Sequence, residues 1–237
     1  MTTFALIHGA GSDGWYWHLV EPELVAAGHE AVAVDLPCDD DTAGLGEYTD
    51  IVVNAMAGRD DVVVVAQSMG GFVAPLVAAR VPAARLIVLV AAMVPAPGET
   101  GNQWWGNTGS GSARREQAER DGRDIDGEFD EVAEFLHDID PALIDEGSKH
   151  VMDQSDTPFK EPWPLPAWPD VPTRFVLPTK DRFFPPDFQR RVVRERLGIE
   201  PDPIDTGHLP ALARPRELAA LLLRYVSETT PSADADG

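Results

Sequence analysis

A serine stands at the junction between a strand-like run and a helix-like run. Residues 61–67 (DVVVVAQ) are apolar almost throughout, and Ser68 follows them directly. The small residues two positions either side, Ala66 and Gly70, allow the tight strand-to-helix turn that lifts a serine hydroxyl above the strand ends. A helix N-terminus also favours developing negative charge. Ser68 is therefore a candidate nucleophile, although the turn alone is equally consistent with a serine that only caps a helix.

A glycine-rich loop follows the first strand-like run, at His8-Gly9-Ala10-Gly11. Attack of a serine on a carbonyl develops an oxyanion, which needs two preorganised donors. The amide after the nucleophile, that of Met69, supplies one, and the glycines let the Ala10 amide approach as the other. We therefore predict oxyanion donors at Ala10 and Met69, with an ordinary glycine turn as the alternative. We expect His8 and Gly9 to border the substrate pocket, with His8 structural or pocket-lining rather than a base.

Two further polar residues follow late strand-like runs. Asp181 comes just after residues 173–178, and His208 lies between a short run at 203–205 and the final helix-like segment. The carboxyl ends of parallel strands meet at one edge of a sheet, so both side chains can reach Ser68. The order serine, aspartate, histidine is that of a nucleophile, its orienting acid and its base on an α/β sheet. We predict His208 as the base and Asp181 as the acid that orients it.

Two other aspartates are weaker candidates for the acid. Asp205 is close to His208 along the chain but is expected in the strand that leads to it, and Asp187 is the reserve. A loop aspartate or histidine is more often solvated or structural than catalytic. Three candidates in the right order, each after a strand-like run, favour the catalytic interpretation.

The elements that must position these residues alternate along the chain. Most strand-like runs are apolar throughout, as in strands buried on both faces of a parallel sheet. Helix-like segments lie between them, punctuated by Gly and Pro. This alternation predicts an α/β fold with a mainly parallel sheet of about six strands and helices on both faces. Strands are expected at 4–8, 31–35, 61–67, 85–93, 173–178 and 203–205, and helices at 15–27, 45–57, 69–80, 185–197 and 215–227.

Residues 94–170 interrupt the alternation. The segment opens with Pro95 and Pro97, contains charged helix-like stretches (112–121, 128–137 and 141–152) and ends in the proline-rich run PWPLPAWPDVP. We predict a small helical cap at 94–170, inserted into a core made of 1–93 and 171–228, with a disordered tail at 229–237. Several aromatic residues of the cap, together with Leu209 of the core, are candidates to line an apolar pocket. The aromatic residues could equally bind the cap to the core; they are Trp104, Trp105, Phe129, Phe135, Trp163 and Trp168.

Composition excludes several classes of partner. The 237 residues, 43% of them hydrophobic, suffice for one substantial core, and the net charge of −21 argues against nucleic acid and anionic membranes. We expect a small-molecule partner and a cytoplasmic location, because no secretory or membrane-spanning segment is visible and the single cysteine, Cys38, cannot form an internal disulfide. No metal or other cofactor is expected: the His and Cys spacing is not that of a metal site, and HGAG is not a dinucleotide fingerprint. The sequence indicates no oligomeric state.

With these residues in place, the chain resembles the α/β-hydrolase superfamily on both flanks of the predicted cap. Residues 7–37 (IHGAGSDGWYWHLVEPELVAAGHEAVAVDLP), the serine turn and GHLP resemble the branch of plant methyl esterases, hydroxynitrile lyases and related bacterial esterases. The resemblance implies that the chain is a serine hydrolase acting on a small, apolar ester. One departure from the usual G-x-S-x-G turn is Ala66 in place of the first glycine.

Two features of the resemblance disfavour other chemistries. Hydroxynitrile lyases of this branch carry a lysine after the histidine, whereas this chain has Leu209. Dehalogenases and epoxide hydrolases use an aspartate nucleophile where this chain has Ser68. A C–C bond hydrolase, a thioesterase, another lyase and a non-catalytic small-molecule binder remain alternatives, because one fold supports many functions.

Overall fold

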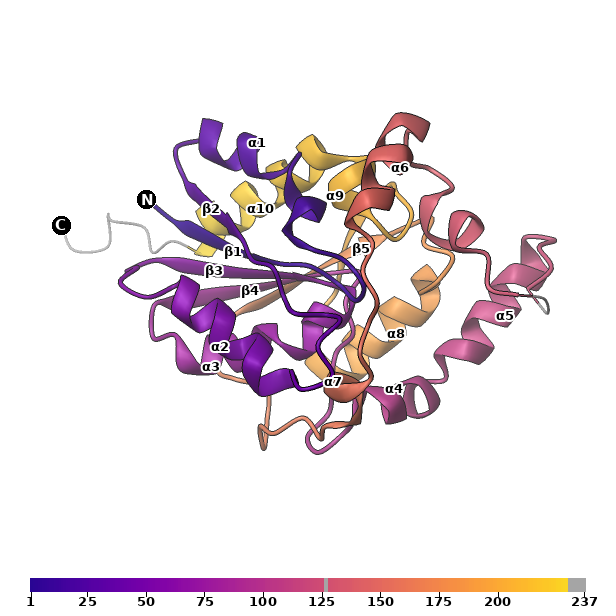
Figure 1. Cartoon of the computed structure of the whole chain (residues 1–237), viewed down its shortest axis with the longest axis horizontal. Helices are drawn as coiled ribbons and strands as arrows, with labels where there is room; N and C mark the ends of the chain where they lie inside the picture. The colour runs from indigo at the N-terminus through magenta and orange to yellow at the C-terminus, as the bar shows by residue number, and fades with distance from the viewer. Residues whose placement is uncertain (126–127, 230–237) are drawn as a thin grey trace.

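Six strands form one parallel sheet in the computed structural model, which describes residues 1–125 and 128–229 (Figure 1). Each predicted strand is present, and its ends differ from the expected ones by at most three residues. The predicted α/β fold is confirmed. The sheet order is β2-β1-β3-β4-β5-β6, formed by β1 (Thr3–Ile7), β2 (Glu30–Ala33), β3 (Val62–Gln67), β4 (Ala84–Val90), β5 (Thr173–Pro178) and β6 (Asp202–Ile204).

The continuous apolar runs are explained by burial on both faces of the sheet. In β3, Val62 and Val64 pack into one hydrophobic cluster, while Val63 and Val65 pack into the other. Both faces therefore select apolar side chains, and the two-residue alternation of a half-exposed strand disappears. One face is covered by α2 (Leu45–Ala55), α3 (Ala74–Arg80) and α8 (Pro186–Leu197), and the other by α1 (Glu21–Ala26) and α10 (Pro215–Thr229) (Figure 1).

Two predicted helices are interrupted. The helix expected at 15–27 is a 3-10 turn, η1 (Gly14–Trp17), followed by α1, and the helix expected at 69–80 is a 3-10 turn, η2 (Ser68–Phe72), followed by α3. In both cases a proline, Pro22 or Pro75, occupies the first turn of the second helix. Proline is tolerated in that turn because the first amides of a helix have no intrahelical acceptor.

The segment between β4 and β5, here called the cap segment, places most of its helices beyond the carboxyl ends of the strands (Figure 1). Its first helix falls in a Gly- and Asn-rich stretch where no helix was expected; Thr100 and Gln103 form a capping box that begins it. The boundaries 94 and 170 of the predicted cap stay a prediction. The segment contains α4 (Gly101–Thr108), α5 (Ser110–Arg120), the π-helix η3 (Val132–Leu136), α6 (Pro141–Gly147), η4 (Ser148–His150) and α7 (Thr157–Lys160).

A short helix, α9 (Pro210–Ala213), precedes the long C-terminal helix α10. Thr229, which we expected in the disordered tail, is the last residue of α10. The rest of that predicted tail, 230–237, lies outside the described residues. Among residues 1–125 and 128–229, no helix combines the length and the apolar character needed to cross a membrane.

A glycine inside the serine turn, Gly71, lies close against the segment that follows β4. A Cβ on Gly71 would lie 1.9 Å from the backbone oxygen of Met93, so even one methyl group forces the backbone apart. We expect Gly71→Ala to lower the free energy of unfolding by about 1–3 kcal/mol, as overpacking does. Urea unfolding measures this effect. The matched control is Gly46→Ala, at an exposed helical position with open space around it; equal stability of the two variants would contradict the close approach.

Candidate active site

Ser68 begins η2 with its backbone in the left-handed region, at φ 49°. This conformation is strained for a residue with a side chain, and such strain recurs at functional turns. The turn is tight: a Cβ on Gly70 would lie 2.9 Å from the backbone oxygen of His8 and 3.3 Å from the Cβ of Ala66. Small residues are therefore required on both sides of Ser68. This is the geometry expected of a turn that presents a serine hydroxyl.

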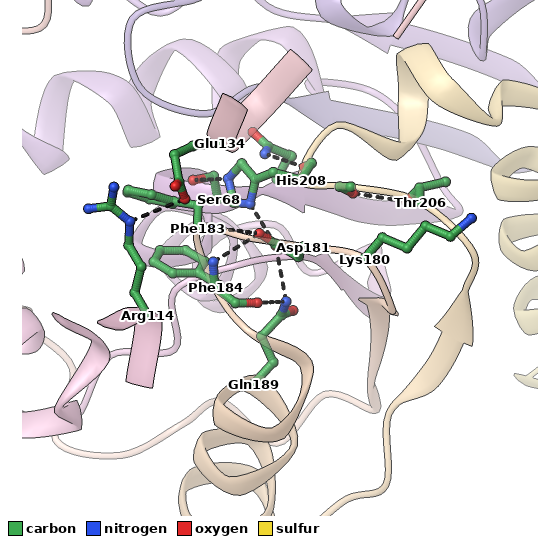
Figure 2. A network of polar contacts seen from close by, with 12 residues as sticks. Ser68, Arg114, Glu134, Lys180, Asp181, Phe183, Phe184, Gln189, Thr206 and His208 are labelled. Carbon is green, nitrogen blue, oxygen red and sulfur yellow. Dashed lines mark hydrogen bonds and ion pairs between the residues drawn. The ribbon is translucent and has the colours of Figure 1, made fainter. Parts of the chain in front are cut away.

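The three side chains expected to form a triad lie together. The Nε2 atom of His208 is 3.2 Å from the Oγ atom of Ser68, and its Nδ1 atom is 2.8 Å from Oδ2 of Asp181 (Figure 2). His208 and Asp181 are buried, with 2% and 1% of their surfaces exposed, whereas Ser68 is half-buried. With Nδ1 donating to the carboxylate, Nε2 is free to accept a proton from the serine hydroxyl. The arrangement can therefore activate Ser68 as a nucleophile.

Asp181 is held in one orientation by four donors. The amides of Phe183 and Phe184 donate to its Oδ1 atom at 2.9 and 2.8 Å, while Oδ2 accepts from His208 and from Nε2 of Gln189 at 3.1 Å (Figure 2). Gln189, a buried residue of α8, was not singled out in the sequence. The sequence did contain a signal for this residue: Gln189 is an amide side chain on the apolar face of the predicted helix that follows Asp181. A fixed carboxylate fixes the histidine ring in turn.

The two reserve candidates for the acid lie elsewhere. Asp187 is exposed on α8. Asp205 is exposed as well, and its Oδ2 atom accepts from Nζ of Lys180 at 2.8 Å. Asp181 is the candidate whose carboxylate meets His208.

The glycine-rich loop lies against the serine turn. Ile7, at the end of β1, pairs with Ala66 of β3, so the loop after β1 begins beside Ser68. A Cβ on Gly9 would lie 3.0 Å from Cβ of Ser68 and 2.2 Å from Oε1 of Gln67. Only a glycine allows the backbone to approach so closely.

The predicted oxyanion donors lie on these two segments. Met69 is the second residue of η2, where helix geometry leaves the N–H without an intrahelical acceptor. Ala10 is exposed in the adjacent loop. The cap segment supports that loop at Gly11, whose N–H donates to Oε1 of Gln154 at 3.0 Å and whose carbonyl accepts from the Met152 amide at 3.0 Å. The oxyanion roles of Ala10 and Met69 stay predictions.

His8 is a buried link between two loops. Its Nε2 atom accepts from the Leu36 amide at 3.0 Å, so Nδ1 carries the proton and donates to the Gly9 carbonyl at 2.8 Å. The ring thereby ties the loop after β1 to the loop after β2. Burial lowers the pKa of His8 below its ordinary value of 6.5, although the Gly9 contact, Asp13 and Asp35 partly oppose the shift.

The lowered pKa of His8 gives the protein a pH-dependent stability. At acidic pH the unfolded chain protonates this histidine before the folded chain does, so unfolding takes up a proton. The contribution of neutral His8 to the free energy of unfolding is complete at pH values above the pKa that this histidine has in the unfolded chain. Below that pKa the contribution falls, by at most about 1.4 kcal/mol per pH unit. Urea unfolding from about pH 7 to about pH 5 is expected to show a steeper loss for the wild type than for His8→Gln. Identical pH slopes would contradict a buried neutral His8.

Aromatic rings surround the imidazole of His208. The centroids of Phe135, Phe183 and Phe184 lie 5.2, 5.4 and 5.2 Å from its ring centroid. Phe135 comes from η3 of the cap segment, while the other two follow Asp181. The ring of Trp105 in turn lies 5.8 Å from the rings of Phe183 and of Phe184. The histidine is thus enclosed in an apolar environment on this side.

Other aromatic candidates attach the cap segment to the core. The ring of Trp104 lies 5.7 Å from that of Phe188 in α8, and the indole N–H of Trp163 donates to the Phe72 carbonyl at 3.1 Å; both tryptophans are 1% exposed. Trp168 stacks on Trp163. Phe129 is 45% exposed, and Leu209 is half-buried just before α9. The pocket roles predicted for His8, Gly9, Trp104, Trp105 and Leu209 stay predictions.

An ion-pair cluster next to Phe135 was not foreseen. Glu134 of η3 is 2% exposed and pairs with Nε of Arg114 at 3.1 Å (Figure 2). It also pairs with Nη1 of Arg123 at 2.8 Å. Arg114 lies in α5 and Arg123 just after that helix, so the cluster ties α5 and its end to the π-helix. In the described part of the chain, no group of three or more His, Cys, Asp or Glu side chains is arranged to hold a metal ion.

The family model described as "Alpha/beta hydrolase family" matches residues 4–221 of this chain. The chain belongs to the α/β-hydrolase family. Among relatives of this α/β hydrolase, Methylesterase 3 of Arabidopsis thaliana is 25% identical, with 94% of this chain and 95% of the relative covered. Methylesterase 7 of the same plant is 29% identical over 95% of this chain and 96% of the relative.

Solved structures share the fold of this α/β hydrolase. Polyneuridine aldehyde esterase superposes with a TM-score of 0.79 at 19% identity, covering 95% of this chain and 99% of that one. An extracellular α/β-hydrolase from a Paenibacillus species superposes with a TM-score of 0.76 at 20% identity, over 94% and 98% of the two chains. The family model and the methylesterase relatives confirm the predicted likeness to the esterase branch of the superfamily.

Proposed function

We propose that this α/β hydrolase cleaves carboxylic esters of small, apolar molecules through an acyl-enzyme on Ser68. The observation that carries the proposal is the hydrogen-bonded series from Ser68 through His208 to Asp181 at a strained strand-to-helix turn. The names of the methylesterases that match along nearly the whole chain support an oxygen ester as the bond cleaved. The rings around His208 support an apolar substrate.

The reaction takes two steps. His208 accepts the hydroxyl proton of Ser68 as Oγ attacks the ester carbonyl, and the Ala10 and Met69 amides stabilise the oxyanion. The tetrahedral intermediate collapses, and the alcohol leaves with the proton from His208. Water, deprotonated by His208, then attacks the acyl-enzyme, and the carboxylic acid is released with Ser68 restored. Asp181 keeps the imidazole in the tautomer that both steps require.

A substrate panel tests the reaction class. The purified full chain is assayed with p-nitrophenyl acetate, a methyl ester of an aromatic acid, the matching thioester and a β-diketone. We expect oxygen esters to be turned over fastest. Faster cleavage of the thioester would replace the esterase assignment by that of a thioesterase. Faster cleavage of the diketone would replace it by that of a C–C bond hydrolase. No turnover of any substrate, with a serine that also fails to react with a fluorophosphonate, would indicate a small-molecule binder.

A further inference from the structure

The chain that leaves the π-helix η3 of the cap segment touches both loops that carry the triad's acid and histidine. Nε2 of His137 lies 3.2 Å from the carbonyl oxygen of Lys180, and Oδ2 of Asp138 accepts from the amide of Gly207 at 2.6 Å. Lys180 and Gly207 are the residues directly before the acid and the histidine. Two consecutive cap residues therefore contact the backbone one residue ahead of each of these two triad members.

The contact of Asp138 with the histidine loop requires a glycine at position 207, because any side chain there would collide with the cap residues. A Cβ at this position would lie 2.7 Å from Oδ1 of Asp138 and 2.8 Å from Nε2 of His137. Gly207 itself is buried. The cap side chains thus pack directly on the backbone of the histidine loop, with no space for an intervening side chain.

Among the described residues, three hydrogen bonds from distant parts of the chain hold the backbone of residues 206–208. The Lys180 amide donates to the Thr206 carbonyl at 2.8 Å, and Nε2 of Gln67 donates to the His208 carbonyl at 3.3 Å. Both of these donors belong to the core. The third bond is the one from the Gly207 amide to Asp138, so the loop is held from the sheet on one side and from the cap segment on the other.

The backbone on both sides of Asp138 is itself anchored. Ile139, the next residue, is 7% exposed and packs in the hydrophobic cluster that includes Tyr16 and Ala211. Three residues before Asp138, the ring of Phe135 lies against His208, and the Ala133 carbonyl accepts from Nη1 of Arg182 at 2.8 Å. Contacts on both sides of Asp138 thus fix its backbone relative to the triad.

We propose that Asp138 is a positioning residue of the cap segment: by accepting the Gly207 N–H, it holds the His208 backbone where Nε2 meets Ser68. The inference rests on the proposed function, since it concerns the placement of the proposed base. A carboxylate makes a stronger acceptor than a carbonyl or a water molecule. Loss of the bond lets the loop shift, and a small misplacement of a general base is costly in rate.

The test compares Asp138→Ala, Asp138→Asn and the control Asp153→Ala, an exposed acid of the same cap segment, in the full chain. We expect Asp138→Ala to lower kcat for p-nitrophenyl acetate roughly tenfold, about 1.4 kcal/mol in activation free energy. KM should stay close to wild type, because ground-state binding of substrate is unchanged. The rate of fluorophosphonate labelling should fall by the same factor. Asp138→Asn should retain most of the activity, since its amide oxygen can still accept from Gly207.

A second variant approaches the contact from the core side. The methyl group of Gly207→Ala displaces the side chains of Asp138 and His137, so kcat should fall in this variant too. If Asp138→Ala does not fold, the kcat of Gly207→Ala tests the positioning role in its place. Once Asp138 is already alanine, Gly207→Ala should cost less than it does alone.

The outcomes separate this inference from the proposed function. Wild-type kcat and labelling rate in Asp138→Ala, while Ser68→Ala is inactive, would overturn the positioning role and leave the esterase assignment intact. An equal loss in Asp138→Asn and Asp138→Ala, or wild-type kcat in Gly207→Ala, would overturn it as well. Full activity of Ser68→Ala would instead overturn the proposed function itself.

Discussion

Ser68→Ala is expected to lower kcat for p-nitrophenyl acetate by about 10⁶-fold, the loss seen when a triad nucleophile is removed. The reason is that Oγ is both the atom 3.2 Å from His208 and the proposed site of the acyl group. Without it, only oxyanion stabilisation and substrate binding remain. Release of p-nitrophenolate, followed at substrate concentrations on both sides of KM, measures the effect.

The control for this variant is Ser148→Ala, which removes an exposed cap serine whose hydroxyl donates to the Asp145 carbonyl. Its kcat should equal that of the wild type. We expect Ser68→Ala to fold, because an exchange of serine for alanine keeps the Cβ and so leaves the packing of the turn unchanged. Urea unfolding checks that it does. A folded Ser68→Ala protein with the kcat of the Ser148→Ala control would exclude Ser68 as the nucleophile.

Asp181→Asn is expected to lower kcat by about 10⁴-fold while the fold is retained. The amides of Phe183 and Phe184 would bind the remaining carbonyl oxygen of the asparagine, which turns its NH₂ group toward His208. Nδ1 of His208 would then accept, and its proton would move to Nε2, the atom that must take the proton of Ser68. The variant should also lose stability, because the NH₂ group would face the donor Nε2 of Gln189.

Two matched controls separate this effect from a general loss of negative charge. Asp187→Asn and Asp205→Asn change the two exposed aspartates that were the reserve candidates for the acid. Both should leave kcat close to wild type in the p-nitrophenyl acetate assay. A loss in Asp205→Asn as large as in Asp181→Asn would reassign the acid of the triad.

The features that followed from the sequence were those with a local pattern. Strand β3 is apolar without alternation because its two faces enter different clusters, so Val63 and Val64 are equally buried. The residues around Ser68 are small because the turn packs closely on β1 and the loop that follows it. The aspartate and histidine were found because each follows a strand, and parallel strands bring their ends to one edge.

The features that escaped prediction depend on contacts between distant parts of the chain. Gln154 meets Gly11 across 143 residues, and Asp138 meets Gly207 across 69 residues. No periodicity marks either pair, because each contact exists only once the cap segment has folded onto the sheet. Helix α4 was missed for another reason: the capping box of Thr100 outweighs the low helix propensity of the glycines and asparagines that follow.

The most direct test of the account is the mass of the intact protein after incubation with a fluorophosphonate, followed by peptide mapping of the adduct. We expect one phosphonyl group per chain, located on Ser68. His208→Ala should label far more slowly, because it lacks the base 3.2 Å from the hydroxyl. A wild-type protein that remains unlabelled, or an adduct on any residue other than Ser68, would contradict the assignment of Ser68 as an activated nucleophile.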